Sequence, residues 1–576
     1  HQPLAYVSKA GFRRDMFEGI AKANFSIGMP MLKDLTFKQL SLRGKTRVEN
    51  VRATGLEGGV GVHGGTMLFD VTEKAIEAQG ELRVNGVEVQ LAWQKIFDAP
   101  AEHQPPIRIR GIFDEKAREN LGLSVNHIVK GDIPAEVQIG LRTGAPPAIS
   151  LEADLTNADL FLTNIGWRKP PGQRALLSMT IEKDDNGRIK LDNFRILGDD
   201  MTITGWVAMN EKRQLSAFHF PNFSFNILTK LEIAGRLSPQ NVWKVEARGR
   251  SYDGRQFFRS LFSAGKLSEN QPKPRKDEPG IDVHAEIDTV IGYYDTTVQN
   301  VIIDASKRNG KLASLDVYGR LNGEAPVAVK LETIPGKPRV LLGEASDAGA
   351  AFRLVGFYPS VRGGEASLKV DLDGEGAAEK QGTLYASNFV VTGDQVVGRV
   401  VRQNGPRRPG TQPAPRGQRG GTQQAEFDSN QLQFDRMTIP FAVGHGQFVL
   451  LNSAINGPLL GATMRGRIDF ERDVINLSGT YVPAYGINAM IGVVPLLGDL
   501  LTGRRGEGIF GITFAIQGPV SNPNVLVNPM SLITPGFLRG IMEFDHTPPR
   551  VIPRTERTPA AAATVPRASS QPPVTR

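Results

Sequence analysis

Apolar and polar residues alternate along most of this chain, and a period of two predicts β-strands. The clearest example is the segment Glu81–Trp93, in which apolar and polar residues alternate on either side of Asn85-Gly86 as far as Leu91. Turn-forming residues arrive about every 8–12 residues, as expected of a meandering antiparallel sheet. Parallel pairing is not expected. It needs crossovers of about a dozen residues, usually helical, and the predicted strands are not separated by such segments. The same alternation recurs at Val242–Arg250, Ser314–Gly323, Ala366–Gly374, Met464–Val482 and Phe510–Pro519.

The turn inside Glu81–Trp93 fixes the register of its two strands. Asn85-Gly86 suits a two-residue type I′ turn, which needs positive φ at both positions. One face of the predicted hairpin is apolar, and the other carries a cross-strand charge pair. The predicted pairs are Val84 with Val87 and Leu82 with Val89 on the apolar face, and Arg83 with Glu88 on the polar face.

The apolar face of such a sheet must be covered, because large exposed apolar patches promote association. A second sheet, a layer of helices or lipid acyl chains could cover it, and the sequence offers few helices. Tandem β-sandwiches and a lipid groove both remain open on periodicity alone. If about 30 strands stack side by side at ~4.8 Å, the sheet would extend ~140 Å, which is far longer than a compact domain of this mass. The candidate groove residues are Val84, Val87, Val89, Leu91 and Trp93.

Three short helices are predicted, at Asp253–Gly265, Ser346–Tyr358 and Gly536–Phe544. In the first, Asp253 is a candidate N-cap, with Gln256 three residues later and Gly265 as the stop.

One of the most apolar windows runs from Ile487 to Gly503 and is too short to cross a bilayer. Its apolar residues follow helical spacing, and Pro495 separates two short predicted helices. These helices either cap the core of the last sheet or form an end-plug that meets a membrane. The candidate residues are Ile487, Met490, Ile491, Val494, Leu496, Leu497, Leu500 and Leu501.

The net charge of +8 is concentrated in two segments of the 576-residue chain. Residues 402–424 hold five arginines and no acid, and residues 546–576 hold five arginines and one glutamate. These segments and the linker 266–280 are predicted to be disordered, because they lack the apolar content that a core needs. The remainder is nearly neutral, whereas a nucleic-acid-binding protein carries its positive charge on a folded face. We therefore expect no nucleic-acid partner.

Catalytic motifs are absent from the sequence. The segment Gly59–Gly64 has dinucleotide-binding spacing, but a predicted strand follows it where that motif needs a helix. The eight histidines are scattered, no serine lies in a G-x-S-x-G motif, and cysteine is absent. We expect no enzyme, no cofactor and no metal site.

Three blocks near the C-terminal end resemble AsmA-like proteins of the YhdP type. They are GRIDFERDVINLSGTYVPAYGIN at Gly466–Asn488, PLLGDLLTG at Pro495–Gly503 and VNPMSLITPGFLR at Val527–Arg539. Weaker similarity extends upstream through Val84–Phe97, Asn164–Ile181 and Glu344–Leu368. Residues 402–424 look like an insertion relative to the family.

The resemblance implies a bridge-like lipid transfer protein that carries phospholipid between the inner and outer membranes of a Gram-negative bacterium. Such proteins lie in the periplasm and are anchored in the inner membrane by an N-terminal helix, which this sequence lacks. The chain begins without methionine and without a signal-peptide core, so we expect a fragment. The alternative is a structural envelope protein of tandem β-sandwiches that carries no lipid.

The predicted fold is mainly β: a long curved antiparallel sheet that forms an elongated apolar groove, with few short helices. The expected divisions are groove segments at 1–265 and 281–401, a linker at 266–280 and the basic insertion at 402–424. An AsmA-like C-terminal region at 425–545 and a disordered tail at 546–576 complete the chain.

Overall fold

A computed structural model describes most of the chain, and β-strands dominate it. The described residues are 17–30, 41–54, 61–97, 99–123, 125–142, 145–162, 165–184, 186–262, 278–373, 380–393, 431–444, 447–458, 460–470, 472–483, 512–520 and 523–528. The predicted end-plug residues 487–501, the helix 536–544, the insertion 402–424 and the tail 546–576 lie outside them.

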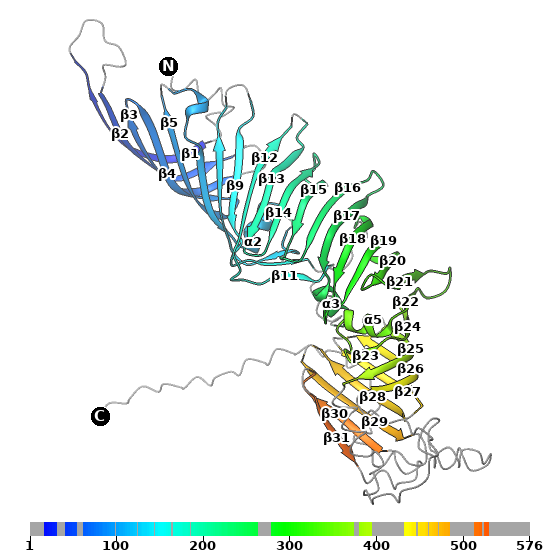
Figure 1. Cartoon of the computed structure of the whole chain (residues 1–576). Coiled ribbons are helices and arrows are strands. Elements are labelled where there is room, and N and C mark those ends of the chain that lie inside the picture. The colour runs from blue at the N-terminus through cyan, green and yellow to red at the C-terminus, as the bar shows by residue number, and fades with distance from the viewer. Residues whose placement is uncertain are drawn as a thin grey trace, which may run out of the picture.

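One open, curved sheet contains 28 of the described strands and gives the molecule its elongated shape (Figure 1). Its first part consists of β1 (Phe17–Gly28), β2 (Ser41–Ala53), β3 (Val62–Thr72), β4 (Ala75–Val84), β5 (Val87–Ile96), β6 (Ile107–Phe113), β8 (Ile133–Gly140) and β9 (Ala148–Asp154). A short 3-10 helix, η4 (Ala101–His103), lies between β5 and β6. Neighbours along the chain are neighbours in the sheet, as a meander requires.

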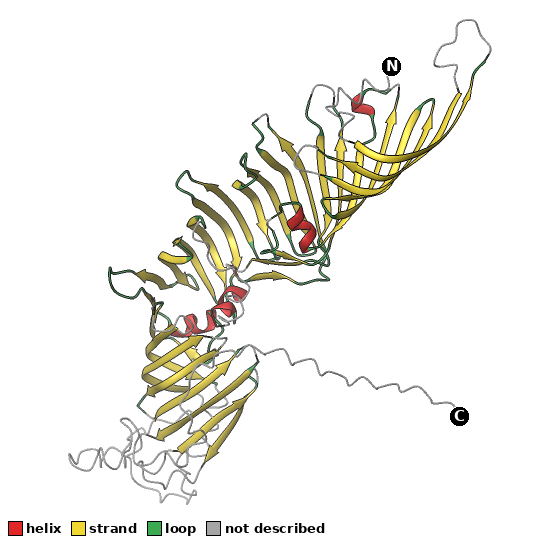
Figure 2. Ribbon diagram, turned by 180° about the vertical axis from the view of Figure 1, so that it is seen from behind, coloured by secondary structure: helices red, strands yellow, loops and turns green. Residues whose placement is uncertain are grey.

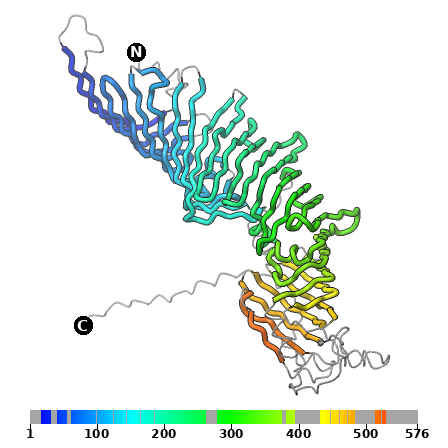
Figure 3. The backbone as a smooth tube through the Cα atoms, in the orientation of Figure 1, coloured from blue at the N-terminus to red at the C-terminus, as the bar shows by residue number. Residues whose placement is uncertain are grey.

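The middle and last parts continue the same sheet, whose curvature is visible in the backbone trace (Figure 3). The middle strands are β12 (Ala175–Lys183), β13 (Ile189–Gly198), β14 (Thr202–Met209), β15 (Leu215–Ser224), β16 (Lys230–Leu237), β17 (Val242–Asp253), β18 (Gly280–Ile291), β19 (Thr297–Arg308), β20 (Lys311–Leu321), β21 (Ala325–Glu332), β22 (Val340–Ala345) and β24 (Glu365–Asp371). The last are β25 (Lys380–Thr392), β26 (Gln431–Gly444), β27 (Gln447–Asn456), β28 (Leu460–Asp469), β29 (Val474–Pro483), β30 (Ile512–Gly518) and β31 (Asn524–Asn528), with the short β23 (Val361–Arg362) beside β25.

The mainly β fold and the long curved sheet are confirmed, but the expectation of purely antiparallel pairing is wrong at one place. Strands β17 and β18 are parallel, with Val245 opposite Val283. The chain between them, residues 254–279, is long enough to return to the starting end of β17. A connection of a dozen or more residues permits parallel pairing. The sheet is therefore mixed.

The predicted hairpin is confirmed in detail. Asn85 and Gly86 have φ angles of 46° and 84°, as a type I′ turn requires. Val84 pairs with Val87, and the guanidinium of Arg83 lies 2.9 Å from the carboxylate of Glu88.

Helices form at two of the three predicted places, and the one predicted at Ser346–Tyr358 is shorter than expected. Helix α5 (Ala348–Leu354) begins after Asp347, whose carboxylate accepts a 2.8 Å hydrogen bond from the amide of Ala350. Helix α3 (Arg255–Phe262) begins after Gly254, whose carbonyl accepts the bond from the amide of Phe258. Asp253 is therefore the last residue of β17 and not the N-cap, and its carboxylate holds the Arg255 guanidinium at 2.7 Å.

Most of the small elements lie along one long edge of the sheet, where alternate strands end, whereas η4 lies at the opposite edge (Figure 2). Those along the first edge are helices α2 (Glu115–Asn120), α3 and α5, together with a separate three-stranded sheet of β7 (Val129–Lys130), β10 (Asp159–Leu162) and β11 (Trp167–Lys169). We call this edge the covered rim, and the opposite ends of the strands the open rim.

Candidate functional site

A row of apolar residues crosses the sheet without a charged interruption. Register alignment places each member directly opposite the next, from β16 to β26. The row on this face reads Ile233, Ala247, Ala285, Ile303, Val317, Val329, Gly343, Leu368, Leu384 and Ile439. Since only alternate residues of a strand share a face, this continuity requires the correct register at every pairing.

The same face is apolar in the first part of the sheet. A second row of directly paired residues leads from β5 to β12 through Leu91, Ile109, Val137, Leu151 and Met179. The predicted groove residues of the hairpin lie on this face of β4 and β5. Val87 and Val89 are buried there, and Val84, Leu91 and Trp93 pack against the same cluster. The structure brings all five residues together.

Burial along this face falls steadily from the covered rim to the open rim. On β20, Leu321 is 1% exposed, whereas Val317 and Leu315 are half-buried. On β18, Val290 and Ile287 are buried, whereas Ile281 is half-buried. The face is therefore an apolar groove that is closed along one side and accessible along the other.

Hydrogen bonds fix the elements of the covered rim to the sheet. The Tyr252 hydroxyl at the end of β17 donates to the carbonyl of Ile165 at 3.0 Å. The buried guanidinium of Arg118 in α2 donates to the carbonyls of Phe113 and Gly131 at 2.7 and 2.8 Å. Burial raises the pKa of Tyr252, which therefore stays a neutral donor. These contacts make the closed side of the groove a fixed part of the fold.

Aromatic rings form a continuous ladder across the groove in the middle of the sheet. Successive ring centroids lie 5.5 to 6.1 Å apart from Trp167 through Phe225, Phe223, Phe220 and Phe218 to Trp243. Tilted and edge-to-face contacts at this spacing are favourable beyond their area. The ladder spans the groove from the covered rim toward the open rim.

In the last strands, large side chains fill the groove. Phe441 and Phe448 stack with ring centroids 4.8 Å apart, and both are buried. Phe389 and Phe434 stack at 5.5 Å in a neighbouring buried cluster. The accessible apolar lining therefore belongs chiefly to the strands before β25.

The opposite face of the sheet is polar. His284 on β18 contacts Asp304 on β19 at 2.7 Å, and Arg110 pairs with Glu136. Hydrogen bonding to Asp304, and then to Glu286, raises the pKa of His284.

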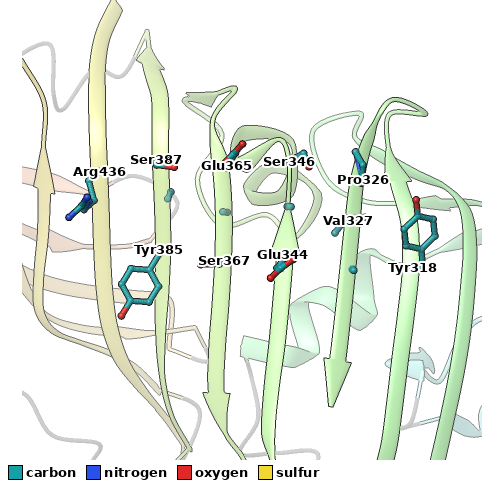
Figure 4. A pocket seen from close by; sticks show the side chains of 14 residues that line it. Tyr318, Pro326, Val327, Glu344, Ser346, Glu365, Ser367, Tyr385, Ser387 and Arg436 are labelled. Carbon is teal, nitrogen blue, oxygen red and sulfur yellow. The ribbon is translucent and has the colours of Figure 1, made fainter. Parts of the chain in front are cut away.

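A shallow pocket of about 750 Å³ lies on this polar face between β20 and β26 (Figure 4). Tyr318, Glu344, Ser367, Tyr385 and Arg436 are among the residues that line it. Its lining mixes hydroxyl, carboxylate and guanidinium groups, so it is distinct in position and chemistry from the apolar groove.

No cluster of three or more metal-ligating side chains occurs among the described residues. None of the described helices is long and apolar enough to cross a membrane.

Sequence reasoning identified the groove face at one hairpin but missed the aromatic ladder. The segment FHFPNFSF from Phe218 to Phe225 contained the signal, since its four phenylalanines recur at intervals of two or three. Two residues of the ladder, Trp167 and Trp243, come from distant segments, and their positions follow only from the tertiary structure.

Comparison with protein-family models, curated proteins and solved structures found no match to this chain.

Proposed function

We propose that the protein is a non-enzymatic lipid conduit, and that its groove carries the acyl chains of phospholipid. The supporting observation is the unbroken apolar row, which is half-buried over much of its length and accessible from the open rim between Ile233 and Leu368. Each acyl methylene that enters the groove gains about 0.8 kcal/mol from leaving water. This driving force needs no polar pocket, because the headgroup stays at the open rim.

The long dimension of the sheet supports a role in bridging two membranes. Twenty-eight strands spaced by ~4.8 Å give an arc of ~130 Å along the hydrogen-bonding direction. With the resemblance of the C-terminal blocks, this extent favours transport between the inner and outer membranes across a Gram-negative periplasm. We propose phospholipid as the cargo, the two membranes as partners, and anchorage by an N-terminal helix outside this sequence.

The alternative architecture of tandem β-sandwiches is wrong, because the described strands form one open sheet and one small sheet. A structural envelope role without lipid cargo is the competing function. The two functions differ in whether the apolar face carries lipid when the protein is purified without detergent.

Strand β19 offers a matched pair of substitutions for the test. Ile303 faces the groove between Ala285 and Val317, whereas the adjacent Ile302 faces Tyr318 on the polar face. Ile303→Glu places a carboxylate in the apolar row, and Ile302→Glu places the same group in water. Leu177 and Leu176 on β12 form a second such pair, with Leu176 exposed on the polar side.

Native mass spectrometry and transfer of fluorescent phospholipid between vesicles provide the two measurements. We expect bound phospholipid in the wild-type protein and in Ile302→Glu, and strongly reduced binding and transfer in Ile303→Glu. Circular dichroism confirms that each variant is folded. Lipid-free wild-type protein, or equal behaviour of the two folded variants, would reject the conduit.

A further inference from the structure

Strand β1 forms one end of the sheet, and all twelve of its residues are exposed. Its groove-side residues are Ala21, Ala23, Phe25 and Ile27, because their partners on β2 belong to the apolar face. Phe25 and Ile27 are 58% and 60% exposed. The apolar lining therefore runs up to this edge and stops in solvent.

The ring of Phe25 is already positioned as part of the lining. It lies over Gly44 of β2, where an added Cβ would come within 2.3 Å of the ring. An aromatic side chain that covers a glycine on a neighbouring strand stabilises the register of a sheet edge. The register of β1 on β2 is thus defined, and from Ala21 to Ile27 no described strand is bonded to the other edge of β1.

The two ends of the sheet differ in how well they resist further pairing. Natural sheets protect their edges with short strands, prolines or inward-pointing charges. At the far end, β31 has only five residues. By contrast, β1 has twelve residues, no proline and no charged residue on its groove side from Ala21 to Ile27. Of the two end strands that the structure describes, β1 therefore offers the longer and less protected edge for pairing.

The polar face beside β1 is basic. Arg43, Lys45 and Arg47 project from this face of β2, and Lys22 projects from β1. The carboxylate of Glu49 lies near both Lys22 and Arg47, at 3.7 and 2.9 Å. In all, these two strands carry five cations and two acids, Glu18 and Glu49, and Asp70 of β3 lies 4.0 Å from Lys45. A pairing strand with outward carboxylates would balance the excess of positive charge.

We propose that β1 is a docking edge for a β-strand of a partner protein, which adds to the sheet and extends the groove. The partner strand has apolar residues at alternate positions, which continue the lining beside Ala23 and Phe25. Its intervening residues are acidic and face Lys22. Strand addition of this kind obtains affinity from backbone hydrogen bonds and specificity from alternate side chains. The proposal depends on the edge strand alone and is independent of lipid binding.

The test uses the full chain and a short fluorescein-labelled peptide in which valine and glutamate alternate. We expect the peptide to bind the wild-type protein and to slow hydrogen exchange of the β1 amides, but not of those in β31. Phe25→Lys, which introduces a charge on the groove side of the edge, should weaken binding by about tenfold or more. The matched control Asn24→Lys lies on the polar face and should bind the acidic peptide at least as tightly.

Two further peptides separate strand addition from charge attraction. A valine–lysine peptide should bind more weakly than the valine–glutamate peptide, and a peptide with all valines in one block should not slow exchange in β1. Circular dichroism shows whether the variants keep the wild-type fold.

Failure of the acidic peptide to bind would overturn the proposal, as would equal binding to Phe25→Lys and Asn24→Lys. Sedimentation of the protein without peptide tests whether a second copy of the chain pairs with β1 instead. A dimer that Phe25→Lys dissociates and that the peptide does not displace would assign this edge to a second copy of the chain, and would also overturn the proposal.

Discussion

The indole Nε1 of Trp167 donates a 3.1 Å hydrogen bond to the carbonyl oxygen of Phe225, and the two rings lie 5.5 Å apart. This contact joins the small sheet to the segment that follows β15 in the large sheet. It holds the covered rim in place through residues that are 58 positions apart in the chain.

Trp167→Ala should loosen the covered rim. Loss of a buried tryptophan side chain costs about 3–5 kcal/mol, and the carbonyl of Phe225 loses its donor. Hydrogen exchange of the β10 and β11 amides should therefore accelerate strongly. Trp167→Phe keeps a ring and should have a clearly smaller effect; equal acceleration by both variants would show that ring packing contributes nothing.

Lys169 should be required for the small sheet although it is a buried charge. Its ammonium donates to the carbonyls of Thr156, Ala158 and Pro170 at 3.1, 2.9 and 3.2 Å. Lys169→Met leaves these carbonyls without that donor and should destabilise the region by about 3 kcal/mol. Local hydrogen exchange measures this loss, and unchanged exchange would contradict it.

The alkaline pH dependence provides a second measurement at this residue. Burial lowers the pKa of Lys169 from its usual 10.5, so the native state releases this proton before the unfolded state does. The cost of burying the charge is present below the lowered pKa and is relieved as the pH rises toward 10.5. The difference in stability between wild type and Lys169→Met should change in this window and remain constant at neutral pH.

His284 should titrate above its usual pKa of 6.5, because Asp304 and then Glu286 stabilise its charged form. The stabilising contribution is full below the unfolded-state pKa and is lost as the pH rises through the raised folded-state value. NMR titration should show the His284 pKa falling toward 6.5 in Asp304→Asn. Glu286→Gln should lower it less, and the reverse order would contradict the assignment.

Asp347→Ala should destabilise α5 by about 1 kcal/mol, because the amide of Ala350 loses its capping acceptor. Faster hydrogen exchange at Ala350 is the measurement. Asp347→Asn keeps a side-chain oxygen and should retain most of the protection. Equal exchange in the two variants would show that the cap does not act through this oxygen.

The hairpin at Asn85-Gly86 was predictable because local information determines it. Two residues with positive φ set the turn, and the turn sets the register that places Arg83 beside Glu88. The alternating pattern likewise predicted the strands and the single apolar face, and both are confirmed for the described part of the chain.

Pairings between strands that are distant in the sequence could not be predicted. The parallel alignment of Val245 with Val283 joins segments on either side of a long connection, and no turn residue specifies it. The aromatic ladder depends on the same alignments, since Trp243 reaches Phe218 through the pairing of β16 with its neighbours. Packing between strands selects such contacts. The alternation of apolar and polar residues does not specify which distant strands pack together.

Most strands of the large sheet pair with the strands that precede and follow them in the chain. Its length is therefore modular. Inserting or deleting one hairpin would change the arc by about 10 Å and leave every other pairing intact. Stability in such an array is a sum over nearest neighbours, as in repeat proteins. Evolution can thus fit a sheet of this kind to the width of the gap it spans by duplicating hairpins, without redesigning a core.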